Sequence, residues 1–432
     1  MKWWGQLRNK RFFLLCLTLT AISFPFPLRV NSLFTVLLFV AWLLYLSTQQ
    51  WKLNLNNPFF KLFVSLYFIY VIGVLWSSNL DRAFFELEKK SFFLVYPLIL
   101  GTIPKLTRTE VNNVLKYFVH SCILVSILCL IYASYRTISS GNFSEIDPVT
   151  NYATHYFFYY GLSDIFLHPV YFSAYIVFSI FIIAAYRGPR WATLSSRAKA
   201  LTALLVIYLI IFLFLLSGRI MIIALFGISM LYTIYHYLTK GSLVRGMSVV
   251  IGCFAIAVLV VATIPVLRER FQQLITSSYR FENNPETNRN LAGQLDGVEM
   301  RLAKWYFTIE AGKNTWLFGT GTGDDEDTLL ATYLANNFLE GYVPQYNAHN
   351  QFLQTWLALG LFGLLILILV FTLPLVLAIK ERNFLYAGLI LVIMAFCLTE
   401  SVFSRQHGVS FYAFFNSLLC FHTLEISTRK GP

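Results

Sequence analysis

Apolar runs of membrane-crossing length recur along the chain, separated by short polar connections. A helix needs about 20 apolar residues to cross the hydrocarbon core, and the backbone of each run must satisfy its own hydrogen bonds in lipid. The alternating pattern of a membrane β-barrel is absent. We therefore predict an all-α polytopic membrane protein of about twelve transmembrane helices, at residues 12–27, 31–48, 58–77, 91–104, 117–137, 166–186, 200–217, 220–238, 246–265, 355–379, 383–401 and 410–426.

One long polar segment, residues 266–346, separates the ninth run from the tenth. Segments of this length inside a compact chain are usually functional or disordered, and helical patterns at 298–311 and 327–339 indicate a folded cap. The chain then divides into 1–265 with nine spans, the cap at 266–346, and 347–432 with a membrane-edge helix and three spans. A shorter connection, about 138–165, is rich in tyrosine and phenylalanine, which either form an interfacial belt or stack on sugar rings.

Composition agrees with a membrane protein. Of the 432 residues, 57% are hydrophobic and 12% are charged, whereas soluble proteins carry about 25% charged residues. The six cysteines all lie within apolar runs, which indicates neither a disulfide framework nor a thiolate metal site. A basic start and an apolar run without a convincing small-residue cleavage site predict a retained first helix.

The distribution of positive charge predicts the orientation of the chain. Lysine and arginine in the short connections fall mainly on the side of the N-terminus, which places both termini in the cytoplasm and the cap outside. This asymmetry explains much of the net charge of +12. Because the inside charges are spread over many loops, they do not form a nucleic-acid-binding patch.

A single imidazole lies where the cap runs back into the membrane. Asn347 is a good N-cap residue, and a helix that starts there places His349 on an apolar stripe in the first helical turn. The positive end of the helix dipole favours a neutral ring that can accept a proton. The same features also fit a hydrogen-bonded boundary histidine.

Basic residues near this histidine are candidates for binding an anion. Arg301 and Trp305 are four residues apart and face the same way on a predicted helix, with Lys304 beside them. Arg219 lies between two apolar runs with almost no loop, where a guanidinium is costly unless it pairs or lines a polar cavity. An arginine presents a planar fork of donors that suits phosphate oxygens.

Three further polar residues lie at the same predicted face. Glu400 ends the eleventh run, where it either neutralises an arginine or acts as a catalytic carboxylate. Arg405 follows it, and His168 precedes Pro169 at the start of the sixth run. His168 also fits a simple interfacial role.

Two motifs in the cap do not predict a cofactor. The glycine-rich residues 319–324 lack the Gly-Lys-Ser/Thr of a phosphate-binding loop and lie outside the cell membrane, so we expect a tight turn after Trp316. The acidic run 324–327 fits complementation of a helix dipole better than a cation site.

Together these motifs resemble the O-antigen ligase and O-antigen polymerase superfamily of bacterial inner-membrane glycan transferases. The resemblance rests on Arg301-x-x-x-Trp305, on the Gly-Thr-Gly turn at 319–321, and on His349-Asn350-Gln351-Phe352-Leu353 followed by Gly-Leu-Phe-Gly at 360–363. It covers nearly the whole chain in layout, including a large periplasmic loop before the histidine. The ligase type is favoured.

The resemblance implies transfer of a glycan from undecaprenyl diphosphate to a hydroxyl of lipid A–core, at the periplasmic face and without a metal or nucleotide cofactor. It implies that arginines hold the diphosphate and that the histidine activates the acceptor. We therefore expect catalytic roles for His349, Arg301 and Arg219. We expect substrate-binding roles for Trp305, Lys304, Arg405, Glu400, Asn350 and His168.

Other functions remain open at this point. An O-antigen polymerase and a protein-directed oligosaccharyltransferase use the same donor chemistry and differ in the acceptor. A transporter or lipid-linked sugar flippase belongs to another class, and it usually shows an internal repeat and charges near the bilayer midplane. The suspected charges here gather at one face beside the cap, which favours an enzyme.

Overall fold

The computed structural model describes residues 10–48, 55–103, 106–146, 153–240, 295 and 297–429, with isolated positions between 248 and 272. The first half contains helices α2 (Lys10–Ser23), α3 (Leu28–Thr48), α4 (Pro58–Gly73), α5 (Leu80–Lys90), α6 (Phe92–Thr102), α7 (Arg108–Ser140), α8 (Tyr160–Ser163), α9 (Pro169–Arg187), α10 (Ser196–Leu215) and α11 (Arg219–Lys240). The second half contains α15 (Glu299–Gly312), α16 (Asp325–Ala335), α17 (Leu339–Tyr342), α18 (Gln351–Lys380), α19 (Phe384–Thr399) and α20 (Gln406–Arg429).

Seven helices in the described part of the chain are long and apolar enough to cross a membrane, and α19 is a shorter apolar helix. These observations confirm an all-α polytopic membrane protein. Eleven of the twelve predicted runs coincide with a described helix, as α2, α3, α4, α6, α7, α9, α10, α11, α18, α19 and α20. Most of the remaining run, 246–265, lies outside the described residues.

Two elements were not anticipated from the apolar pattern. Helix α5 is an amphipathic helix between α4 and α6, and the side chain of Asn79 caps it by accepting from the Arg82 backbone N–H. The aromatic connection near 138–165 contains a short antiparallel hairpin of β1 (Ser144–Ile146) and β2 (Ala153–His155), followed by α8. Both elements have too few apolar residues in a row to resemble a span.

The bundle packs around α9, α18, α19 and α20. Helix α18 packs on α19 and α4, α19 packs on α9 and α11, and α20 packs on α6. Aromatic rings fill much of the shared core: Phe24 on the α2–α3 turn contacts Phe411, Phe414 and Phe415 of α20. Aromatic pairs of this kind add about 0.5–1.5 kcal/mol each beyond the burial of their area.

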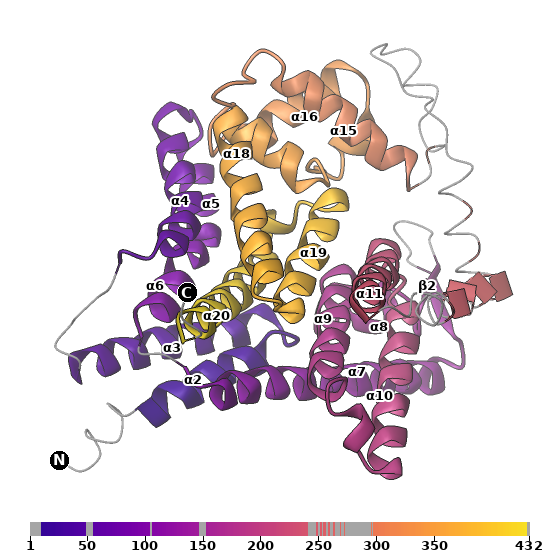
Figure 1. The fold of residues 1–432 in the computed structure, drawn as a ribbon. Coiled ribbons are helices and arrows are strands. Elements are labelled where there is room, and N and C mark those ends of the chain that lie inside the picture. Colours follow the sequence, from indigo (N-terminus) through magenta and orange to yellow (C-terminus); the bar gives the residue numbers. More distant parts are fainter. Residues whose placement is uncertain are drawn as a thin grey trace.

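The described part of the cap, residues 297–346, is a small helical layer seated on one end of α18, at the top of Figure 1. Helices α15 and α16 pack on each other and on α18. A separate apolar cluster joins them, and it includes Phe307 of α15, Tyr333 of α16 and Leu357 of α18. This cluster confirms the predicted helices at 298–311 and 327–339, with ends shifted by one to four residues.

The Gly-Thr-Gly turn of the cap fits into a break in α18. Gly319 and Gly321 have φ of +77° and +111°, and Gly360 of α18 has φ of +62°. The backbone N–H groups of Thr320 and Gly321 donate to the carbonyls of Leu357 and Ala358, which the break frees from intrahelical bonding. The turn predicted after Trp316 is therefore present, and it anchors the cap to the bundle.

Candidate active site

The helix that follows His349 begins later than the sequence suggested. Asn350, not Asn347, is the N-cap of α18, because its side-chain oxygen accepts from the backbone N–H groups of Phe352 and Leu353. Asn347 instead accepts from the His349 N–H in a local turn. The prediction that His349 lies in the first helical turn is therefore wrong. His349 directly precedes the N-cap and has φ of +46°, a strained backbone that costs about 1–3 kcal/mol.

Amide side chains around His349 hold this strained backbone in place. Asn350 donates to the Leu398 carbonyl near the end of α19, and Gln351 accepts from the Phe403 N–H just before α20. Gln354 accepts from the Ala348 N–H and donates to Asp325 of the cap. These contacts explain the polar residues at the start of α18. Sequence reasoning gave no role to Gln351 and Gln354, although glutamine inside an apolar run was a signal for one.

His349, Glu400 and Arg301 meet at the boundary between the cap and the bundle. The His349 Nδ1 lies 3.0 Å from one Glu400 carboxylate oxygen, and Arg301 Nη2 lies 3.1 Å from the other. The His349 Nδ1 atom is fully buried and makes no hydrogen bond of good geometry with any described residue, but the Glu400 carboxylate lies 3.0 Å from it. This carboxylate favours the tautomer with a proton on Nδ1, because it is an acceptor within reach of that proton. About 25% of the His349 side chain is exposed, so the rest of the ring is accessible.

The electrostatics of this cluster favour a neutral imidazole beside a carboxylate. Burial acts to raise the pKa of Glu400, but the bonds and charges of His349 and Arg301 outweigh it and hold the pKa at about 2. Burial lowers the pKa of His349 below its ordinary value, and the carboxylate only partly offsets this effect. With Nδ1–H turned to Glu400, the neutral ring keeps Nε2 as its proton acceptor.

The two arginines of the prediction approach each other across Gly297. A Cβ atom placed on Gly297 would lie 3.2 Å from Arg219 Nη2, and Arg301 Nη1 donates to the Gly297 carbonyl. Arg219 is the first residue of α11 and lies two residues after Ser217, which has φ of +54°. The tight α10–α11 junction thus aims Arg219 at the start of the cap.

Arg301 is only partly available to a ligand. Its Nε donates to the Thr399 carbonyl, and its other two nitrogens donate to Gly297 and Glu400. A guanidinium has five N–H groups, so these three bonds leave two donors. Arg301 therefore links α15 to the end of α19 and keeps two N–H donors for a ligand.

Lys304 and Trp305 support the histidine from the cap. The Trp305 indole N–H donates to the His349 carbonyl. Lys304 is buried, with Nζ 3.6 Å from the centre of the Tyr346 ring. Burial lowers the pKa of Lys304 to about 7, with a further contribution from Arg301. Lys304 is therefore a titrating group near neutral pH and not a permanent cation.

His168 and Arg405 lie within electrostatic range of the same cluster. His168 caps α9 by accepting from the Val170 N–H at Nδ1. Burial lowers the pKa of His168 to about 4, and Arg405 acts in the same direction. The charges of Glu400 and His349 also act on His168. The folded chain therefore gathers all of the predicted site residues at the cap end of the bundle, although Asn350 and Trp305 use their polar atoms on the protein itself.

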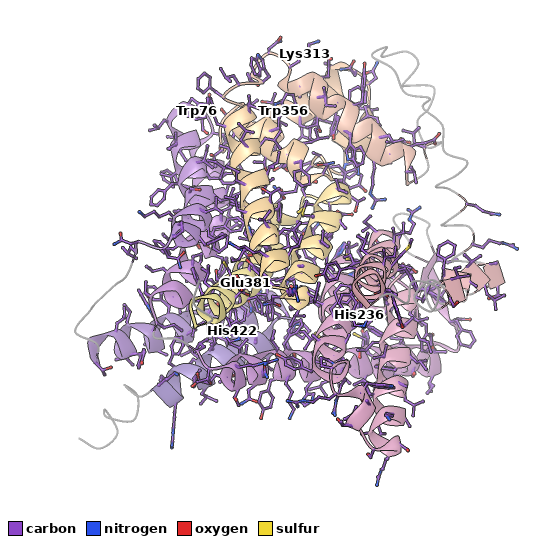
Figure 2. All side chains as sticks on the ribbon, viewed as in Figure 1. Trp76, His236, Lys313, Trp356, Glu381 and His422 are labelled. Carbon is purple, nitrogen blue, oxygen red and sulfur yellow. The ribbon has the colours of Figure 1, made fainter. Side chains whose placement is uncertain are left out.

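Figure 2 shows the same end of the molecule with Trp356 and Lys313 labelled, and shows Glu381 and His422 well away from it. Trp356 lies in the second turn of α18, and Glu381 follows the last residue of that helix. The candidate site is thus at one end of α18, opposite to the connection between α18 and α19.

The acidic run of the cap is engaged with the protein. Asp324 accepts from the Ser78 and Asn79 N–H groups, Asp327 accepts from the Asn79 side chain, and Glu326 pairs with Arg82. These contacts dock the start of α16 on the start of α5. Among the residues that the structure describes, no group of three or more His, Cys, Asp or Glu side chains is placed to hold a metal ion.

Comparison with known protein families gives an independent finding. Residues 204–368 match the family described as O-Antigen ligase. The matched region contains Arg219, Arg301 and His349, whereas Glu400 lies beyond its end. No curated protein matches the chain. The chain therefore carries an O-antigen ligase family domain over residues 204–368, which indicates a membrane glycan transferase of the ligase and polymerase type.

Proposed function

We propose that this protein transfers a glycan from undecaprenyl diphosphate to a hydroxyl of lipid A–core oligosaccharide, as an O-antigen ligase. The observation that carries the proposal is the contact of His349 with Glu400, beside Arg301 and Arg219, inside a domain of this family. A neutral imidazole fixed by a carboxylate is suited to removing a proton from an attacking hydroxyl.

The proposed reaction uses each group for a separate task. His349 Nε2 takes the proton of the acceptor hydroxyl as its oxygen forms a bond to the anomeric carbon of the glycan. The bond from that carbon to the diphosphate oxygen breaks, and undecaprenyl diphosphate leaves with the electron pair. Glu400 stabilises the imidazolium that forms, because its carboxylate remains ionised at a pKa of about 2.

The leaving group is stabilised by fixed positive charge. Arg219 and the two remaining donors of Arg301 bind the diphosphate oxygens, on which negative charge grows as the bond breaks. Lys304 adds charge below its pKa of about 7, and Arg405 extends the positive field toward His168. No metal or nucleotide takes part in this scheme.

The membrane arrangement that goes with this function has twelve spans, with both termini in the cytoplasm and the cap in the periplasm of a bacterial inner membrane. Support comes from the placement of α15 and α16 at one end of α18 and from the bias of lysine and arginine toward the opposite connections.

The surface glycan of a deletion strain tests the acceptor. Loss of a ligase leaves bare lipid A–core on a gel and accumulates long lipid-linked polymer. Loss of a polymerase leaves core capped by a single repeat unit, and that result would replace the ligase proposal. An unchanged glycan profile would contradict both.

A further inference from the structure

A second hydrogen-bonded group lies beside the candidate site, on helix α8 and the start of α9. The Tyr160 hydroxyl lies 2.9 Å from His168 Nε2, and the two rings meet edge to face. Helix α8 packs on α9. Tyr160 is 45% exposed, so about half of the residue is accessible.

The helix cap fixes the direction of the bond between these two side chains. The Val170 backbone N–H donates to His168 Nδ1, so that nitrogen carries no proton. A neutral imidazole has one N–H, which must then be on Nε2. His168 therefore donates to Tyr160, and the Tyr160 oxygen is an acceptor in this bond.

The Tyr159 ring packs against Tyr160. The two rings lie 4.4 Å apart and meet edge to face, and burial raises the pKa of the Tyr160 hydroxyl, so it keeps its proton. Because the Tyr160 oxygen accepts from His168, its own hydroxyl proton remains to be donated to another acceptor. Successive hydrogen bonds polarise one another, which strengthens the last donor of such a chain.

The backbone of Tyr159 is strained where it contacts the junction between α10 and α11. Tyr159 has φ of +51° and ψ of −122°, an unfavourable conformation for a residue with a side chain. Its N–H donates to the carbonyl of Leu215 at the end of α10, four residues before Arg219. Strained residues of this kind gather at functional sites. The charges of Arg405 and Glu400 also reach Tyr160.

We propose that the Tyr160 hydroxyl donates a hydrogen bond to a phosphate oxygen of the lipid-linked diphosphate donor, with His168 as its positioning residue. This inference rests on the proposed function and deepens it. An anionic oxygen is the acceptor that suits a polarised O–H within reach of the Arg405 charge. If Tyr160 only belonged to an interfacial aromatic belt, its ring would be needed and its hydroxyl would not.

The substitution Tyr160→Phe tests this role, because it keeps the ring and removes only the hydroxyl. The measurements are the dissociation constant of undecaprenyl diphosphate for the purified full-length protein and the KM for the glycan donor. We expect both to rise about tenfold, the usual effect of losing a hydrogen bond to a charged group, with a smaller change in kcat. Tyr135→Phe is the matched control, since Tyr135 is also exposed and lies outside the cluster.

The variant His168→Asn tests whether His168 acts through its hydrogen bond to Tyr160 or only through packing. Asparagine retains an oxygen that can cap α9, but it lacks the ring N–H that reaches Tyr160. It should weaken donor binding in the wild-type background and have little further effect in the Tyr160→Phe background. An equal loss of donor affinity in both backgrounds would contradict an effect of His168 through Tyr160.

Two outcomes distinguish this inference from the proposed function. Normal binding of undecaprenyl diphosphate by the wild type, with unchanged affinity in Tyr160→Phe, would overturn the role of Tyr160 alone. Absence of both binding and transfer in the wild type would overturn the proposed function and this inference together.

Discussion

Glu400 contacts both the histidine and the arginine of the candidate site. It lies 3.0 Å from His349 and 3.1 Å from Arg301, and it directly follows the last residue of α19. The alternatives drawn from the sequence, neutralising an arginine or acting in catalysis, are therefore not exclusive. A carboxylate that fixes the histidine tautomer and pairs with the arginine performs both tasks.

The substitution Glu400→Gln should lower the rate of transfer by about 10²-fold or more, because His349 then loses the carboxylate that orients its ring and stabilises its protonated form. Glutamine keeps the shape of the side chain but cannot stabilise an imidazolium. The measurement is kcat on purified protein, with folding checked by thermal unfolding. A folded variant that retains the wild-type rate would exclude Glu400 from the mechanism.

The pH profile of the same variant gives a second, independent result. The wild-type rate should fall on the acid side as His349 takes up a proton, with a midpoint below the ordinary histidine pKa, because burial lowers that value. Glu400 opposes this lowering, so its loss should move the acid limb to still lower pH. A shift to higher pH would contradict the contact between the two side chains.

At the scale of helices and turns, the break in α18 is the feature on which the site depends. Gly360 has φ of +62° and ψ of −157°, a region open only to glycine. A Cβ atom there would lie 2.2 Å from the Leu317 carbonyl oxygen. The break frees the carbonyls that hold the Gly-Thr-Gly turn and the cap.

We expect Gly360→Ala to lower the unfolding temperature by several degrees and to reduce transfer, because the backbone strain and the contact with Leu317 both act against the folded state. Gly227→Ala in α11 is the matched control, since no atom lies within 4 Å of a Cβ placed there. The control should unfold at the same temperature or higher, as alanine favours a helix by about 1 kcal/mol. Equal behaviour of the two variants would contradict the account of the break.

Asp325 links α16 to α18 and should make the docking of the cap dependent on pH. Burial raises the pKa of Asp325 to about 6, with a smaller contribution from Glu86, and the bond from Gln354 opposes it. Lys90 and Arg82 also lower this pKa. The folded state therefore binds more protons than the unfolded state between pH 3.8 and 6, and stability falls as the pH rises through that range.

The variant Asp325→Asn removes the free-energy cost of ionising a buried carboxyl group and retains an oxygen that accepts from Gln354. It should unfold about 2–4 °C above the wild type at pH 7.5 and at the same temperature near pH 4. Thermal unfolding at the two pH values checks the result. A lower unfolding temperature at pH 7.5 would show that the Asp325 charge stabilises the cap.

For the molecule as a whole, the apolar pattern was sufficient to predict the helical class and most helix positions, because lipid and core both demand uninterrupted apolar runs. It was not sufficient for α5, whose alternating charges lack such a run, nor for the helix start at Asn350. Two asparagines, Asn347 and Asn350, compete for that cap, and only the contact of Asn350 with α19 decides between them.

The same limit applies to the candidate site. Residue type and position suggested His349, Arg301, Arg219 and Glu400, since each is a polar residue at an apolar boundary. The contact of Glu400 with His349 joins residues 51 positions apart, and no local pattern encodes it. The role of Tyr160 likewise depends on which ring nitrogen of His168 carries the proton. That position follows from the bond donated by the Val170 N–H, which only the folded structure shows.

The orientation of the whole chain can be tested by labelling single cysteines. The native cysteines are buried wherever the structure describes them, so background labelling should be low in a Cys253→Ser variant. A cysteine at Lys313, in the exposed part of the cap, should react with a membrane-impermeant maleimide in spheroplasts. A cysteine at the exposed Arg190 should react only after the membrane is opened. The reverse pattern would invert the topology.

The most direct test of the account is the transfer activity of purified His349→Ala with undecaprenyl-diphosphate-linked glycan and lipid A–core. We predict that the wild type forms glycosylated lipid A–core and that the folded variant does so at least about 10²-fold more slowly, since the acceptor hydroxyl loses its base. A folded His349→Ala protein that transfers glycan at the wild-type rate would contradict the central claim.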